Sequence, residues 1–210
     1  MSNFFKVNIL GNYLLKKCIQ VFILYFLLYG SLIAEEFSFD LSTKGVTFAS
    51  FQMTTKNDSR RYEIASVFES TGILGVFTRI RVVSGAHGVI SMEDNLDLNP
   101  LEVMSRWQSL INKKQSKIRY KDNRIIYYEV LPKARNNPYA IDPFELQGVI
   151  DPLTVTYWML KRRNIAQLCK GKKLVSEGQS VMSVQFQFKK EIDGFIHCEG
   201  NIKFLKGFDP

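Results

Sequence analysis

Most of this chain consists of short segments in which apolar and polar residues alternate. Phe37, Phe39 and Leu41 are separated by polar residues, and Phe186 and Phe188 repeat the pattern far along the chain. Because successive side chains of a strand point to opposite faces, such alternation predicts strands that are buried on one side only. The pattern therefore favours a mainly β fold, in which one face of an antiparallel sheet covers a core.

Turn residues separate these segments and allow the strands to be placed. We expect strands over 37–41, 46–53, 61–69, 101–107, 117–121, 124–131, 173–176, 181–190 and 195–204. Asp122 and Asn123 predict a tight hairpin turn between two of them. Segments 79–84 and 89–93 are expected to form another hairpin across the glycine-bounded turn 85–88.

A main α-helix is predicted at about 151–164. Asp151 is a good N-cap, and Pro152 suits the first helical position because it lacks an amide hydrogen that would have no partner there. The apolar side chains fall at i, i+4 and i+7, on one side of a helix: Leu153, Tyr157 and Leu160, with Trp158 beside them. We therefore expect a large curved antiparallel sheet or open barrel with one helix laid against it.

The first 34 residues have the features of a signal peptide. Lys16 and Lys17 precede an apolar run over 19–29, and a small residue, Ala34, stands before the first acidic residues. The apolar run is short for a membrane-spanning helix. We expect export and cleavage after Ala34, with an uncleaved anchor as the alternative.

The remaining segment, 35–210, is expected to be a single β-rich periplasmic domain, because its length suits one well-filled core. The whole chain has 28 basic and 20 acidic residues, a net charge of +8. The leader holds three of the basic residues and no acidic one, so 35–210 has 25 basic and 20 acidic residues, a net charge of +5. This modest excess suits an anionic partner or a membrane surface without requiring one, and we expect no nucleic-acid binding. The densest basic stretch consists of Lys113, Lys114, Lys117, Arg119 and Lys121.

Cleavage would remove Cys18 and leave Cys169 and Cys198 in a compartment where disulfides persist. The two residues are either buried thiols or one structural disulfide, and we favour the disulfide. Neither lies in a Cys-x-x-Cys motif, which argues against redox catalysis.

Residues typical of catalysis are sparse, and we expect no enzyme. His197 precedes Cys198 directly, so on a strand the two side chains point to opposite faces and cannot act together. His87 stands in a predicted turn. The acidic residues Glu93, Asp94 and Asp97 are more typical of a solvated loop than of a cation site. We therefore predict no catalytic residue, no metal and no cofactor.

Several short motifs occur in a characteristic order. They are Tyr62-Glu63-Ile64, Thr71-Gly72-Ile73-Leu74-Gly75-Val76-Phe77, Arg106-Trp107, Gly148-Val149-Ile150-Asp151-Pro152-Leu153-Thr154, Cys169-x-Gly171, His197-Cys198 and Gly207-Phe208. In the order and spacing of these motifs, the chain resembles the alphaproteobacterial form of an exported family, the domain-of-unknown-function family 3108. The resemblance implies an envelope protein of antiparallel strands curved around an interior, with one helix after the Asp-Pro-Leu motif and two recurring cysteines. The chain departs from the family at 176–180, where relatives carry a basic segment.

Binding of an apolar ligand is the function we expect. A curved sheet with an apolar inner face can hold a lipid, as a LolA-like half-barrel of the bacterial envelope does, by analogy of fold. The candidate ligand-binding residues are Phe48, Phe68, Leu74, Phe77, Trp158, Phe186 and Phe188, of which Leu74 and Phe77 would form a flap. Membrane contact would be transient unless the leader stays attached, and the sequence leaves the oligomeric state open. The alternative is a surface-interaction or secreted protein whose core is solid and which acts on an envelope or host partner.

Overall fold

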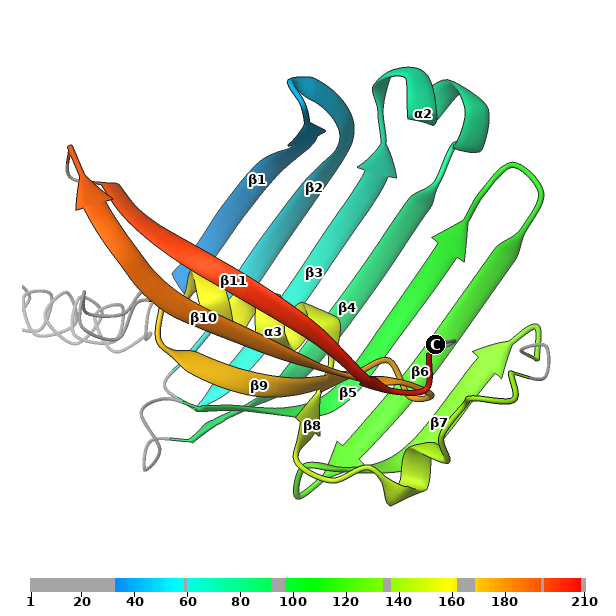
Figure 1. Ribbon diagram of the computed structural model, residues 1–210. Coiled ribbons are helices and arrows are strands. Elements are labelled where there is room, and N and C mark those ends of the chain that lie inside the picture. The colour runs from blue at the N-terminus through cyan, green and yellow to red at the C-terminus, as the bar shows by residue number, and fades with distance from the viewer. Residues whose placement is uncertain are drawn as a thin grey trace, which may run out of the picture. The chain divides into compact units, whose positions relative to one another are not determined.

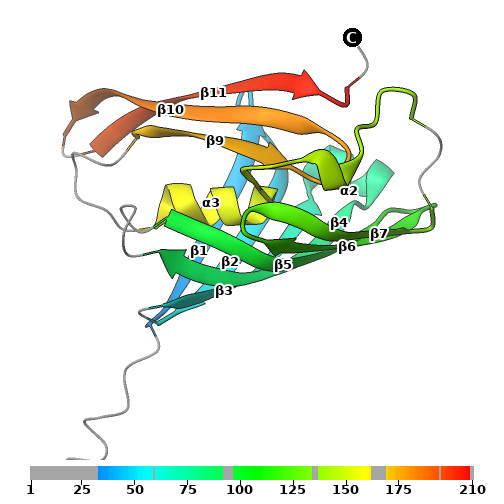
Figure 2. The ribbon, with the colours of Figure 1, turned by 90° about the horizontal axis from the view of Figure 1, so that it is seen from below.

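The computed structural model describes residues 33–58, 60–91, 97–133, 137–161, 169–193 and 195–208. They form two β-sheets that lie on either side of a helix, as Figure 2 shows. The prediction of a mainly β fold is confirmed. Residues 1–32 of the predicted leader lie outside the described ranges, and the first strand begins at Ile33, two residues before the predicted mature start at Glu35.

The first sheet has seven antiparallel strands, which lie in the order of the sequence. They are β1 (Ile33–Thr43), β2 (Val46–Asn57), β3 (Arg61–Ser70), β4 (Arg81–Ser91), β5 (Asp97–Gln108), β6 (Lys113–Lys121) and β7 (Arg124–Leu131). Strands β1 and β7 form opposite edges, so the described sheet is open (Figure 1).

The second sheet has four strands in the order β11-β10-β9-β8. They are β8 (Val149–Ile150), β9 (Gly171–Ser176), β10 (Val181–Ile192) and β11 (Phe195–Lys206). The short β8 runs parallel to β9, whereas β10 is antiparallel to both of its neighbours, β9 and β11. The prediction of one large sheet is therefore corrected to two sheets, because the strands after residue 148 pair only with one another in the described ranges.

The predicted hairpin across 85–88 is wrong. Strand β4 runs without a turn through Gly85 and Gly88 and pairs with β3 on one side and β5 on the other. Neither glycine has a positive φ. A Cβ atom at Gly88 would lie 2.6 Å from the hydroxyl oxygen of Tyr62. Gly88 is therefore required for the close approach of a buried tyrosine, not for a turn.

The hairpin predicted at Asp122 and Asn123 is confirmed. Both residues have positive φ values, 50° and 57°, and they connect β6 to β7. Asparagine and aspartate tolerate this left-handed conformation better than most residues, which explains why the short sequence pattern was sufficient here.

Within the described residues, two α-helices and one 3-10 helix accompany the sheets. They are α2 (Gly72–Thr78), η1 (Pro143–Glu145) and α3 (Pro152–Leu160). The predicted start of α3 is confirmed: Asp151 is the N-cap and Pro152 follows it. The helix ends at Leu160, and the rest of the predicted segment, from 162, lies outside the described residues. The sequence analysis did not predict α2.

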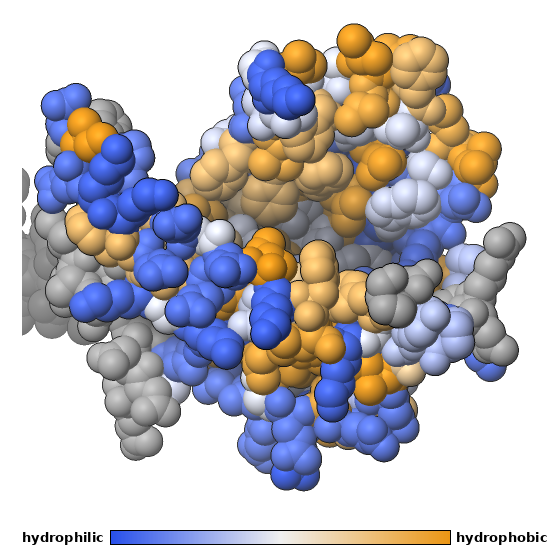
Figure 3. All heavy atoms as spheres, in the orientation of Figure 1, coloured by the Kyte–Doolittle hydropathy of each residue, from blue (hydrophilic) through white to orange (hydrophobic). Residues whose placement is uncertain are grey.

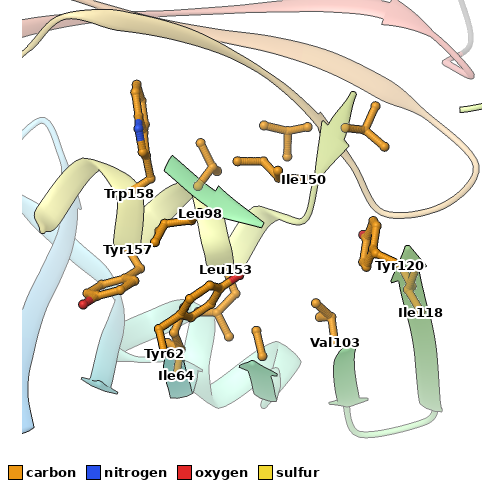
Figure 4. Close-up of a cluster of buried hydrophobic side chains, with 14 of the residues drawn as sticks. Tyr62, Ile64, Leu98, Val103, Ile118, Tyr120, Ile150, Leu153, Tyr157 and Trp158 are labelled. Carbon is orange, nitrogen blue, oxygen red and sulfur yellow. The ribbon is translucent and has the colours of Figure 1, made fainter. Parts of the chain in front are cut away.

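Helix α3 lies between the sheets and forms the centre of the core (Figure 4). Leu153, Tyr157 and Trp158 are buried, and the ring of Tyr157 lies 5.9 Å from that of Tyr62 on β3. Burying a large apolar side chain contributes about 1.5–3 kcal/mol. Because a sheet covers each side of α3, apolar residues occupy almost its whole circumference.

Two covalent or ionic connections stabilise this arrangement. Asp97 on β5 and Lys173 on β9 form an ion pair that joins the two sheets. The predicted disulfide between Cys169 and Cys198 is confirmed, with Cα atoms 5.3 Å apart. It connects the start of β9 to β11 and thereby spans β10, which lies between these strands.

Candidate ligand-binding site

A cavity of about 480 Å³ lies against the inner face of the first sheet. Strands β4 to β7, the start of α3 and residue Glu177 surround it. Its apolar wall residues are Val82, Val103, Trp107, Ile118, Val130 and Leu153. Figure 3 shows a hollow between the upper part of the first sheet and the second layer.

A row of serines crosses the inner face of the sheet at this point. Ser66, Ser84, Ser105 and Ser116 are direct neighbours on β3, β4, β5 and β6. The hydroxyl groups of Ser84 and Ser105 share a hydrogen bond of 2.9 Å. Three of these serines, all except Ser66, line the cavity. Their small side chains leave a volume that larger residues would fill.

The inner face is packed on one side of the serine row and open on the other. On β5, Leu98 and Val103 are buried, whereas Ser105 and Trp107 are only half-buried. Helix α3 packs against the end of the strand near Leu98. The cavity therefore begins where the cover provided by α3 ends, and it extends toward Trp107.

Asp151 lies in the wall of the cavity and is fully buried. One carboxyl oxygen accepts a hydrogen bond of 2.8 Å from the backbone N–H of Thr154, whereas Oδ2 has no hydrogen-bond partner. Burial raises the pKa of Asp151, against the lowering effect of its bond from Thr154. A carboxyl group at this position can accept a hydrogen bond from a ligand, and in its protonated form it can also donate one.

Tyrosines surround this carboxyl group. The hydroxyl groups of Tyr62 and Thr154 share a hydrogen bond of 3.1 Å. The hydroxyl of Tyr120 is buried without a partner. Burial raises the pKa of both tyrosines, and Asp151 in its ionised form would raise it further, so both are neutral phenols. A buried polar group without a partner is unusual in a native protein, and an ordered water or ligand commonly satisfies it.

Charged side chains border the cavity at Lys114 and Glu177. Tyr128 belongs to strand β7, and its ring lies against Gly178 in the turn after β9. Burial raises the pKa of Tyr128 to about 12, with a smaller effect of Glu177. The site thus combines an apolar wall with a few polar groups, which is the usual composition of a small-molecule pocket.

A second hollow lies on the outer face of the first sheet, around Gly85. Glu63, His87 and Arg106 belong to its lining, and all three are exposed. Since this hollow faces solvent and is bordered by exposed charged side chains, the inner cavity is the better candidate for ligand binding.

The seven predicted ligand-binding residues do not come together. Phe68 pairs with the cavity residue Val82 across β3 and β4, but none of the seven belongs to the cavity lining. Trp158 is buried in the core, and Phe186 is half-buried against it. The other positions are a half-buried Phe48 on β2, exposed Leu74 and Phe77 on α2, and exposed Phe188 on β10.

The sequence analysis missed the serine row and the role of Asp151 in the cavity wall. Serines at inward positions between aliphatic residues of successive strands are the signal that could have indicated a gap. Their alignment depends on the register of four strands, which one strand's pattern does not give.

The residues considered for catalysis or metal binding form no such site within the described ranges. Cys198 is bonded to Cys169 and is not a free nucleophile. Of the acidic loop, Glu93 and Asp94 lie outside the described ranges, and Asp97 is paired with Lys173. Within the described part of the chain, no group of three or more potential metal ligands occurs. The helices of that part are too short or too polar to cross a bilayer.

Comparisons with protein-family models, curated proteins and solved structures find no match to this chain. The resemblance to the exported family therefore stays a prediction, and functional argument depends on the geometry of the site.

Proposed function

We propose that this chain is an exported, non-enzymatic envelope protein that binds a lipid or another apolar ligand in the inner cavity. The observation that carries the proposal is the cavity of about 480 Å³, with an apolar wall and a buried carboxyl group whose second oxygen has no partner. Pockets for small molecules typically enclose about 300–1,000 Å³ and orient the ligand with a few polar groups.

The chemistry of the wall favours an amphipathic ligand. Val82, Trp107 and Val130 would contact an apolar chain, while Asp151 and the serine hydroxyls would bind a polar group that accepts or donates hydrogen bonds. The open sheet with a helix across its inner face supports the analogy with a LolA-like half-barrel, at the level of fold alone.

Two features support an extracytoplasmic location. The disulfide between Cys169 and Cys198 is typical of oxidising compartments, and the leader predicted at 1–34 has the pattern of a secretory signal. N-terminal sequencing of the protein recovered from the envelope tests this part, and a protein retained in the cytoplasm would contradict it.

A substitution that fills the cavity tests ligand binding. We expect Ser105→Phe to remove co-purifying lipid in native mass spectrometry, because the new ring would occupy the space beside Trp107. The matched control is Met104→Phe, which places the same side chain at the neighbouring, exposed position of β5. The control should retain the lipid.

The free energy of unfolding of Ser105→Phe and Met104→Phe is a second test of the cavity. An additional ring in a packed core costs about 1–3 kcal/mol, whereas a ring that enters an empty cavity should not destabilise the fold. Ligand-free wild-type protein, or a Ser105→Phe variant that still carries lipid, would contradict the proposal.

A further inference from the structure

One end of the first sheet carries an exposed apolar surface. We call it the apolar rim and define it as Ile73, Val76 and Phe77 of α2, with Leu110 and Ile111 of the turn between β5 and β6. Their exposed fractions are 70%, 68%, 72%, 54% and 88%, respectively. Isolated exposed apolar residues are common, but five on two neighbouring connections indicate a contact surface.

The two connections that form the apolar rim lie side by side. Helix α2 joins β3 to β4, and the turn 109–112 joins β5 to β6, so the antiparallel order places both at the same end of the sheet. The backbone N–H of Leu110 donates a hydrogen bond of 3.3 Å to the carbonyl oxygen of Thr78. In Figure 1 both lie at the upper right, and Figure 3 shows hydrophobic atoms gathered there.

Helix α2 is held so that its apolar side chains point away from the sheet. A Cβ atom at Gly72 would lie 2.9 Å from the carbonyl oxygen of Thr47, and one at Gly75 would lie 2.7 Å from that of Ser70. The glycine side of the helix therefore packs against backbone. The other side, with Ile73, Val76 and Phe77, is left to solvent.

Basic residues accompany the apolar rim. Arg79 follows α2 and Lys113 follows the turn 109–112, and both are exposed. No acidic residue occurs in 70–81 or in 103–121. Glu69, just before this region, forms an ion pair of 3.0 Å with Arg81. At the other end of the sheet, Asp122 directly follows Lys121, and Asp58 lies two residues before Arg60.

We propose that the apolar rim docks the protein on the surface of an anionic phospholipid bilayer. Apolar side chains would enter the interface between headgroups and acyl chains, while Arg79 and Lys113 would lie among anionic headgroups. Each basic residue near such a surface strengthens binding, and this charge complementarity favours a bilayer over a second copy of a basic protein.

The position of the cavity agrees with this orientation. Val82, Trp107 and Lys114 line the cavity and are cross-strand neighbours at the end of the strands that bears the apolar rim. A lipid would therefore have a short path between bilayer and cavity. This last step rests on the proposed ligand binding, whereas docking does not.

Vesicle cosedimentation tests the docking surface. The probe is a vesicle of phosphatidylethanolamine with a quarter phosphatidylglycerol, and the protein is used in the form recovered from the envelope. We expect the double variant Phe77→Ser, Ile111→Ser to bind about tenfold more weakly or worse, because two apolar anchors are lost. The matched control is Phe144→Ser, Ile126→Ser, which removes an exposed phenylalanine and an exposed isoleucine outside the apolar rim, with exposed fractions of 56% and 54%. This control should bind like the wild type.

The dependence of vesicle binding on charge is an independent test. Binding of the wild-type protein should weaken with added salt and with vesicles of phosphatidylcholine alone. The double variant Arg79→Gln, Lys113→Gln should bind anionic vesicles more weakly than the wild type. Equal binding by the rim variant and the control would overturn the proposal. So would loss of self-association or of a protein partner in the rim variant without any change in vesicle binding.

The two proposals can fail separately. The rim variant should retain co-purifying lipid if the cavity binds it, and Ser105→Phe should still bind vesicles. Loss of vesicle binding in Ser105→Phe would show that the bound lipid, and not the apolar rim, attaches the protein to the membrane.

Discussion

Asp151 and Thr154 are joined by a hydrogen bond of 2.8 Å, in which the backbone N–H of Thr154 donates to one carboxyl oxygen of Asp151. The same carboxyl group lies in the cavity wall with its other oxygen unpartnered. One residue therefore begins the central helix and places a polar group in the cavity wall. The predictions below separate these roles and test the packing around them.

Asp151→Asn should retain the cap and change the pH dependence of stability. Burial raises the pKa of Asp151 in the folded protein above the usual value of about 3.9. Between these two pKa values the folded state binds more protons, so Asp151 makes stability fall as pH rises through this window. The asparagine variant should lose this part of the decline. Denaturant titrations from acid to mildly alkaline pH measure it, and unchanged curves would contradict burial of the carboxyl group.

Removal of the disulfide should destabilise the domain without changing its fold. Cys169 and Cys198 are 29 residues apart in the sequence. In the chain-entropy model a bond closing such a loop contributes about 3–4 kcal/mol. We expect the variant Cys169→Ser, Cys198→Ser to lose stability of this order in chemical denaturation. Addition of a reductant to the wild type should have the same effect and should not affect the variant.

Gly88→Ala should be strongly destabilising. A Cβ atom at Gly88 would lie 2.6 Å from the hydroxyl of Tyr62 and closer still to the carbonyl oxygen of Asn99. Since backbone cannot easily move away, we expect a loss of about 2 kcal/mol or more. Gly85→Ala on the same strand is the control, because the nearest atom would be 3.7 Å away. Thermal unfolding of both variants checks the difference, and equal losses would argue against the close approach.

Tyr157→Phe should cost about 1 kcal/mol, because the Nδ2 group of Asn57 then loses the hydroxyl to which it donates at 2.7 Å. The ring of Tyr157 and its packing against Tyr62 would remain. Tyr139→Phe, at an exposed position, should have no measurable effect. The free energy of unfolding of the two variants gives the comparison, and a neutral Tyr157→Phe would show that Asn57 finds water instead.

Local patterns were sufficient where one or a few neighbouring residues decide the conformation. Asp151 and Pro152 predicted the helix start, and Asp122 and Asn123 predicted a tight turn, because capping and positive φ depend on nearby backbone groups. The same reasoning failed at Gly85 and Gly88. A glycine can serve a turn, a close approach or an ordinary strand position, and only the tertiary structure shows that Gly88 lies against Tyr62 whereas Gly85 has room for a Cβ atom.

The candidate site was less predictable than the strands. Apolar, mostly aromatic residues were expected to bind the ligand, but Trp158 lies in the packed core and Phe77 is exposed on α2. The cavity is instead formed around small residues, Ser84, Ser105 and Ser116. A small residue in one strand does not by itself predict a cavity. The cavity forms only where small residues of neighbouring strands lie side by side.

The sequence alone determined that the chain is mainly β, where α3 begins, and which two cysteines remain after the predicted leader. These properties follow from periodicity, capping and composition, which act over a few residues. Tertiary structure decided that the strands divide into two sheets around α3, that serines of separate strands form one row, and that Asp151 lies in a cavity wall. Each of these depends on strand register and layer packing, which bring together residues distant in the sequence.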